Sequence, residues 1–106
     1  MLVDDYLKLD HGFDVDISQT QDFPEAMFHV TVATQEGEQT THTVRLQETY
    51  WQKLTGSGKV SAQDLVEATF DFLLKREGNE SILPEFDIAQ VAEFFPEFEG
   101  VIRQQL

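Results

Sequence analysis

The sequence predicts an α+β fold in which a small antiparallel sheet of three strands precedes several helices packed on one of its faces. In the first half of the chain, apolar residues alternate with polar ones, which is the period of a half-buried strand. After residue 47 the apolar spacing lengthens to about 3.6 residues, the period of a helix. Strands that all precede the helices, instead of alternating with them, are typical of the α+β class.

Three strands are expected, at about residues 13–17, 27–34 and 41–47. Their inward apolar positions are Phe13, Val15 and Ile17 in the first, Phe28, Val30 and Val32 in the second, and Val44 and Leu46 in the third. Gly37 can adopt a positive φ angle, so the polar loop around it predicts a hairpin between the second and third strands. Pro24 cannot donate to a sheet ladder and therefore marks the connection before the second strand.

Four helices are expected to follow, at about residues 48–55, 61–77, 87–95 and 97–104. In the second of these, Ser61 is a candidate N-cap with Asp64 at position N3, and Gly78 is expected to stop the helix in the left-handed conformation. The third begins with a capping pattern, Asp87 followed by Gln90. The second helix has so wide an apolar stripe that it needs two neighbours, such as the sheet and another helix.

Length and composition indicate one folded domain, residues 1–106. A chain of 106 residues can bury one core without disulfides, and 41% hydrophobic residues with nine Phe are too many for a disordered chain. The sequence has no cysteine, which favours a reducing compartment, and we expect a cytoplasmic location. We expect neither a secretory signal, because the first ten residues are acidic, nor a membrane span, because no run of about eighteen apolar residues occurs.

Charge is unevenly distributed along the chain, whose formal net charge is −13. Residues 41–78 hold five of the seven Lys and Arg, and they hold as many acids, so the flanking segments carry the whole excess of acid. Such a surface repels anionic lipid and opposes nucleic-acid binding, but it speeds encounter with a basic protein. We therefore expect a protein partner. The acidic flanks have two interpretations: they face a basic partner, or, the preferred one, they only keep the chain soluble or suit a salty cytoplasm.

Several short motifs lie in the second half of the chain: Tyr50 to Thr55, Asp64 to Val66, Phe72 to Glu77, Ser81 to Leu83, Phe86 with Asp87, and Phe95 to Glu99. Together they resemble a group of small bacterial proteins that has no assigned function. The resemblance covers roughly residues 44 to 99. It implies a bacterial origin and a single domain, and it carries over no catalytic or binding residue.

A strand, a short helix, a glycine-containing turn and a longer capped helix follow one another over residues 43–76. This order resembles the ribbon-helix-helix unit of bacterial repressors and antitoxins, in which strands paired between two chains read bases in the major groove. The resemblance implies Thr43, Arg45 and Gln47 as the DNA-reading residues, and a phosphate contact at the amides after Ser61. A DNA-binding regulator or antitoxin is therefore the alternative hypothesis. It ranks second because this strand is expected to pair with the second strand of its own chain and because the net charge opposes phosphate.

No pattern in the sequence predicts catalysis, a metal or a cofactor. General acid–base chemistry needs a positioned partner and a cleft, and His11, His29 and His42 are expected on solvated positions. Asp14 and Asp16 would share one face of a strand, but two carboxylates fall short of the six to eight oxygen ligands that Ca²⁺ takes. We expect no catalytic residue, no metal ligand and no cofactor.

The aromatic residues of the two expected C-terminal helices suggest an interaction surface. Phe94 and Phe95 would lie about 100° apart on a helix, so one of them is expected to be exposed. If Leu74, Phe94 and Phe98 meet at the surface, they form an apolar patch suited to a homodimer or to a partner helix. The sequence thus predicts a non-enzymatic module that works by binding another protein, with the DNA-binding regulator as the alternative.

Overall fold

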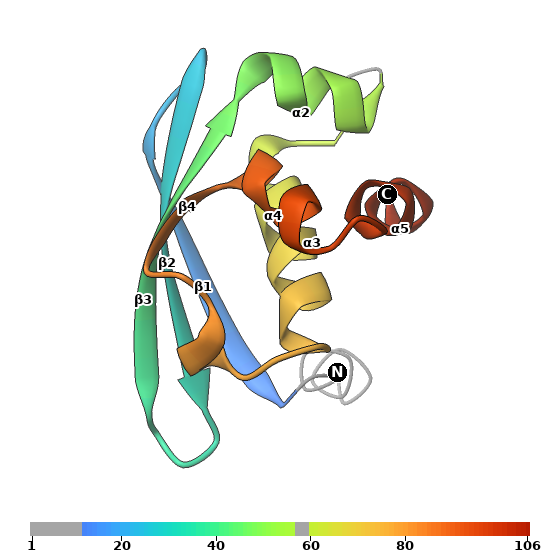
Figure 1. Ribbon diagram of the computed structural model, residues 1–106. Helices are drawn as coiled ribbons and strands as arrows, with labels where there is room; N and C mark the ends of the chain where they lie inside the picture. Colours follow the sequence, from blue (N-terminus) through green and yellow to red (C-terminus); the bar gives the residue numbers. More distant parts are fainter. Residues whose placement is uncertain (1–11, 57–59) are drawn as a thin grey trace, which may run out of the picture.

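A mixed sheet of four strands forms one layer of the molecule and the helices form the other (Figure 1). The computed structural model describes residues 12–56 and 60–106. The strands lie in the order β1 (Phe13–Gln21), β2 (Glu25–Thr34), β3 (Gln39–Gln47) and β4 (Glu85–Asp87). The first three are antiparallel, whereas β4 returns after two helices and pairs parallel to β3. The α+β class is confirmed, and the sheet has one strand more than predicted.

The predicted alternation determines which face of the sheet is buried. Phe28, Val30 and Val32 on β2 are completely buried, as are Val44 and Leu46 on β3. The hairpin between these strands turns at Gly37, whose φ angle of +93° is the left-handed conformation expected of it. The opposite face of the sheet carries polar side chains, and no described helix covers it (Figure 1).

All the described helices lie on one side of the sheet (Figure 1). They are α2 (Glu48–Thr55), α3 (Ala62–Leu74), the 3₁₀ turn η1 (Asn79–Ser81), α4 (Ile88–Phe94) and α5 (Phe98–Gln105). Eight of the thirteen residues of α3 are buried, because it packs on β1 and also on α5. Each completely buried Leu, Val or Phe stabilises the fold by roughly 1.5–3 kcal/mol. The two neighbours that the wide stripe of α3 required are therefore present.

The helix starts follow the predicted capping residues, but one predicted stop is wrong. The Ser61 hydroxyl accepts a hydrogen bond from the Asp64 amide over 3.0 Å, and Asp87 and Gln90 form a complete capping box. α3 ends at Leu74, three residues before the predicted end, because the amides of Arg76 and Glu77 both turn back to the Leu73 carbonyl. Gly78 has a φ angle of −74° and precedes η1, so it is not the left-handed stop.

The chain also departs from prediction in β1 and β4. β1 continues to Gln21, although residues 18–21 are polar and exposed, because its backbone keeps its hydrogen bonds to β2. β4 was not expected because three residues are too few to show a period of two. It forms because the edge of β3 opposite β2 is open to it, and only Phe86 of its residues is buried. The three-stranded antiparallel sheet is thus corrected to a four-stranded mixed one.

Aromatic side chains fill the space between α3 and the C-terminal helices. The Phe72 ring packs edge-on against Phe98, with centroids 5.1 Å apart, and against Phe95 at 5.6 Å. The Tyr50 hydroxyl donates to the Glu99 carboxylate over 2.8 Å, which joins α2 to α5; burial and this hydrogen bond raise the pKa of Tyr50.

Within the described ranges, no helix is long and apolar enough to cross a bilayer.

Candidate functional site

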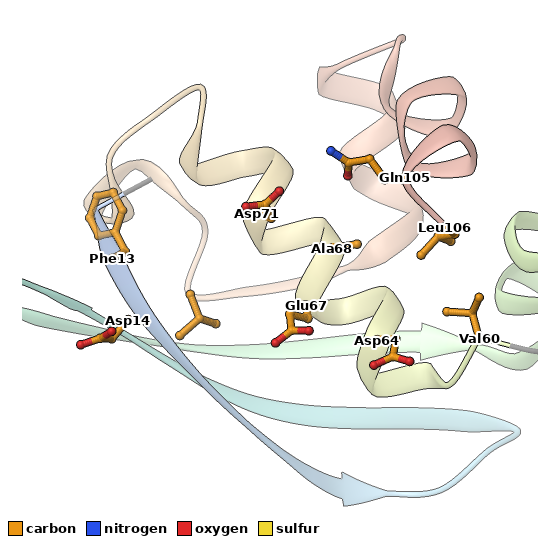
Figure 2. A pocket seen from close by; sticks show the side chains of 10 residues that line it. Phe13, Asp14, Val60, Asp64, Glu67, Ala68, Asp71, Gln105 and Leu106 are labelled. Carbon is orange, nitrogen blue, oxygen red and sulfur yellow. The ribbon is translucent and has the colours of Figure 1, made fainter. Parts of the chain in front are cut away.

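Two hollows open on different sides of α3, and the larger one is lined by acids (Figure 2). This acidic groove has a volume of about 780 Å³ and lies between β1, α3 and the C-terminal end of α5. Its lining residues are Phe13, Asp14, Val15, Val60, Asp64, Glu67, Ala68, Asp71, Gln105 and Leu106. The lining thus combines apolar side chains from several segments with four carboxylates.

Three of these carboxylates belong to one stripe of α3. Asp64, Glu67 and Asp71 are spaced three and four residues apart, which brings them to one helix face (Figure 2). Asp71 pairs with Lys75 one turn on, at 3.2 Å. Among the described residues, no three acids or histidines are grouped closely enough to hold a metal ion.

The smaller hollow has an apolar lining and a volume of about 230 Å³. This apolar groove lies between the C-terminal end of α3, the 78–84 segment with the start of β4, and α4. Its lining residues are Leu73, Glu77, Ser81, Ile82, Leu83, Phe86, Gln90, Val91, Phe94 and Phe95. Glu77 is the one charged residue among them. Such a lining suits an apolar side chain from a partner, with few polar groups to orient it.

The apolar groove is lined by two of the three exposed large hydrophobic residues among those described. Among all the described residues, three large hydrophobic side chains are exposed: Phe94 at 65%, Leu83 at 45% and Leu106 at 41%. Phe94 and Leu83 both line the apolar groove, whereas Leu106 lines the acidic one. Single exposed hydrophobic residues are ordinary, but two of the largest on one hollow are typical of a contact surface.

The Leu83 side of the apolar groove is held in place by a buried histidine. His42 on β3 is 2% exposed, and its Nδ1 donates to the Leu83 carbonyl over 2.7 Å. A carbonyl can only accept, so Nδ1 bears the proton; in the neutral ring Nε2 then accepts from the Thr40 hydroxyl at 2.9 Å. Asn79 donates to the same hydroxyl oxygen over 3.1 Å. This chain of hydrogen bonds fixes both η1 and the Leu83 segment to the sheet.

The backbone adds a second attachment beside His42. The Thr43 amide donates to the Pro84 carbonyl over 2.7 Å, and both residues directly follow the pair joined by the His42 contact, His42 and Leu83. Among the described residues, no buried side-chain polar atom lacks a hydrogen-bond partner. Leu83 is therefore exposed on a segment that is fixed in position, which reduces the entropy that a partner would have to remove on binding.

Glu77 gives the apolar groove its only charge. Partial burial raises the pKa of Glu77, and no described residue donates a hydrogen bond to its carboxylate or forms an ion pair with it. The neighbouring Arg76 points elsewhere: its guanidinium lies 3.6 Å from the centre of the Phe72 ring and 3.6 Å from a Glu97 oxygen. The carboxylate is therefore partly desolvated without a cation to compensate it.

The predicted patch of Leu74, Phe94 and Phe98 is not formed at the surface. Phe98 is completely buried and Leu74 is 5% exposed, whereas Phe94 is the most exposed large hydrophobic residue described. Phe98 is the first residue of α5 and packs against Phe72. It does not share a helix face with Phe94, because the helix is interrupted between α4 and α5. Leu83, which no periodic pattern marked, takes their place beside Phe94.

The residues of the DNA-reading alternative lie on the open face of the sheet. Thr43, Arg45 and Gln47 alternate with the buried Val44 and Leu46, as expected. Arg45 pairs with Glu85 on β4 at 2.9 Å, and Gln47 donates to Glu25 on β2 over 2.7 Å. β3 lies inside the sheet, with its 43–45 backbone between β2 and β4 of the same chain.

The histidines do not form a pair. His29 is opposite Thr43 and is exposed on the open face, whereas His42 is opposite Val30 and points toward the helices. A solvated position was expected for both, and for His42 that expectation is wrong. The alternation that buries Val44 and Leu46 also places His42 inward, so the sequence contained the signal. His11 lies outside the described residues.

Comparison with known proteins does not add a relative. No protein-family model matches the chain, and no curated protein or solved structure is similar enough to it to indicate kinship.

Proposed function

We propose that this protein is a non-enzymatic interaction module that binds another protein at the apolar groove. The observation that carries the proposal is the placement of Phe94 and Leu83, two of the three exposed large hydrophobic residues described, on one apolar hollow. The His42 contacts support it further, because they hold the Leu83 segment ready for a partner. The absence of cysteine supports a cytoplasmic location for this activity.

The energetics of such a groove suit a protein partner. A side chain inserted between Phe94 and Leu83 would cover apolar surface now in contact with water, at about 25 cal/mol for each Å² removed. Aromatic residues at the centre of an interface commonly account for 2 kcal/mol or more of binding free energy when truncated. We therefore expect Phe94 to contribute most and Leu83 to add to it.

The test begins with a partner captured from the native cell and continues with measured affinities. Once the partner is identified and purified, Phe94→Ala and Leu83→Ala should each weaken its binding by at least about tenfold, as expected for central interface residues. Leu106→Ala is the matched control, because Leu106 is similarly exposed but lines the acidic groove. A partner whose affinity is unchanged by both groove variants would contradict the proposal.

A further inference from the structure

The occupant of the apolar groove can be specified more closely from its charges, on the premise that the proposed function is right. We infer that the groove takes a cationic amphipathic segment of another protein, which inserts a large apolar side chain between Phe94 and Leu83 and places a Lys or Arg against Glu77. The segment must therefore provide both chemistries within one short stretch.

The lining of the groove supplies the first reason. Its polar members are Glu77, Ser81 and Gln90, so no cation lies in it to attract an acidic ligand. The Gln90 side chain is already engaged, since its Oε1 accepts from the Asp87 amide over 2.8 Å in the capping box. Glu77 is thus the charged group that a ligand meets on entering.

The state of that carboxylate supplies the second reason. Glu77 is partly removed from water, which raises its pKa, and no described residue pairs with it. A ligand that covers the groove removes more water from Glu77, which is costly unless the ligand also brings a compensating cation. An apolar ligand without a Lys or Arg would therefore bind less well than one that has it.

Charge also argues against a second copy of this chain as the occupant. A twofold interface places the same patch against itself, so the acids of one groove would face those of the other. Glu93 precedes Phe94 and Glu80 precedes Ser81, and both glutamates are exposed. Two copies, each with a formal net charge of −13, would bring these like charges together, whereas a cationic partner would neutralise them.

The experiment uses a phage-displayed library of random 16-residue peptides, panned on the full chain. We expect wild-type protein to enrich peptides that combine Leu, Phe or Trp with Lys or Arg. For a synthetic peptide from that pool, Glu77→Lys should weaken binding at least about tenfold, and Glu77→Gln less. Replacing the critical Lys or Arg of the peptide by Glu should weaken binding to wild type and restore it to the Glu77→Lys variant.

Glu67 provides the matched control for charge. Glu67→Lys makes the same Glu-to-Lys change at an exposed position on α3 that faces the acidic groove, whereas Glu77 lies in the segment after α3. It changes the net charge of the chain equally, so it should reduce affinity only by the general effect of that charge. Equal losses from Glu67→Lys and Glu77→Lys would overturn the inference. Both residues have solvent contact, and circular dichroism would verify that each variant is folded.

Two outcomes separate this inference from the proposed function. If Phe94→Ala and Leu83→Ala abolish peptide binding while Glu77→Lys behaves like Glu67→Lys, the groove binds protein but the cation assignment is wrong. If no peptide prefers wild type over Phe94→Ala, the proposed function fails and the inference fails with it. Restoration of binding by the reversed charge pair supports both.

Discussion

Phe94 and Phe98 lie four residues apart, yet one side chain is 65% exposed and the other is completely buried. On a continuous helix these positions would share one face. α4 ends at Phe94, the chain is extended at Phe95 before Pro96, and α5 begins at Phe98, so different helices carry the two rings. The interruption therefore divides one aromatic segment between the core and the apolar groove. On spacing alone, the two rings would have been expected on the same face.

This difference predicts a separation of roles. Phe98 packs against Phe72 inside the helical layer and should contribute mainly to stability. Phe94 lines the apolar groove and should contribute mainly to binding. The variants that follow test how completely the two roles are separated, beginning with the largest expected effect.

Phe98→Ala should lower the free energy of unfolding by about 3–5 kcal/mol, because it removes a completely buried ring and leaves a cavity beside Phe72. Such a loss is a large part of the 5–15 kcal/mol that holds a typical domain together. Urea denaturation followed by circular dichroism measures it. Phe98→Leu keeps most of the volume and should cost less. A loss below about 1 kcal/mol for the alanine variant would mean that Phe98 is not part of the core.

His42→Leu should lower the free energy of unfolding by about 1–3 kcal/mol, because it leaves the Leu83 carbonyl without its side-chain donor. The Leu83 segment should also loosen, which hydrogen exchange at the amides of β4 would detect as faster exchange. His29→Leu is the control, since His29 is exposed on the open face of the sheet. Its effect should stay within about 0.5 kcal/mol. Equal losses of stability in His42→Leu and His29→Leu would show that the hydrogen bonds of His42 do not stabilise the fold.

Local patterns predicted the elements well where the signal was periodic or chemical. The strand alternation, the bounds of α2 and the capping box at Asp87 all follow from neighbouring residues. β4 could not be predicted in this way, because three residues show no period and its pairing depends on an edge of β3 that only the folded sheet presents. The end of α3 was misplaced because Gly78 was expected to need a positive φ, and it does not.

The apolar groove was predictable only in part. Exposure of one of two adjacent aromatic residues was expected from helix geometry, and Phe94 is that residue. Leu83 and Glu77 line the same groove as Phe94, but they belong to segments that come close to α4 only after the chain folds back through β4. Nothing in the run Ile82-Leu83-Pro84 indicates that one residue is buried and the next exposed. Which residues line the groove therefore depends on the tertiary structure. The inward direction of His42, in contrast, could be predicted from the alternation along its strand.

Phe94→Ala should change the free energy of unfolding by no more than about 0.5 kcal/mol, because the ring is mostly in contact with solvent. Its expected effect is on binding, where the affinity for a selected peptide should fall at least about tenfold. Denaturation and titration on the same preparation would show both values. A stability loss as large as that of Phe98→Ala would place Phe94 in the core and end the comparison between them.

Glu77→Gln has the smallest expected effect on stability. Unlike the variants above, it should raise the free energy of unfolding. The pKa of Glu77 is raised in the folded chain, so folding disfavours its charged form; this penalty is full above the folded pKa and disappears as the pH falls below the ordinary value of 4.5. The variant should therefore be more stable than wild type at pH 7 by a few tenths of a kcal/mol, and the gain should vanish near pH 4.

Glu67→Gln sharpens that measurement because it removes one negative charge from an exposed position on α3, whereas Glu77 lies in the segment after that helix. Relief of general repulsion should be common to both variants, so the difference between them at pH 7 reports the burial of Glu77. Equal gains would show that burial contributes nothing. A larger gain for Glu77→Gln, combined with weaker peptide binding, would mean that the apolar groove retains a carboxylate at some cost in stability, as residues kept for binding commonly do.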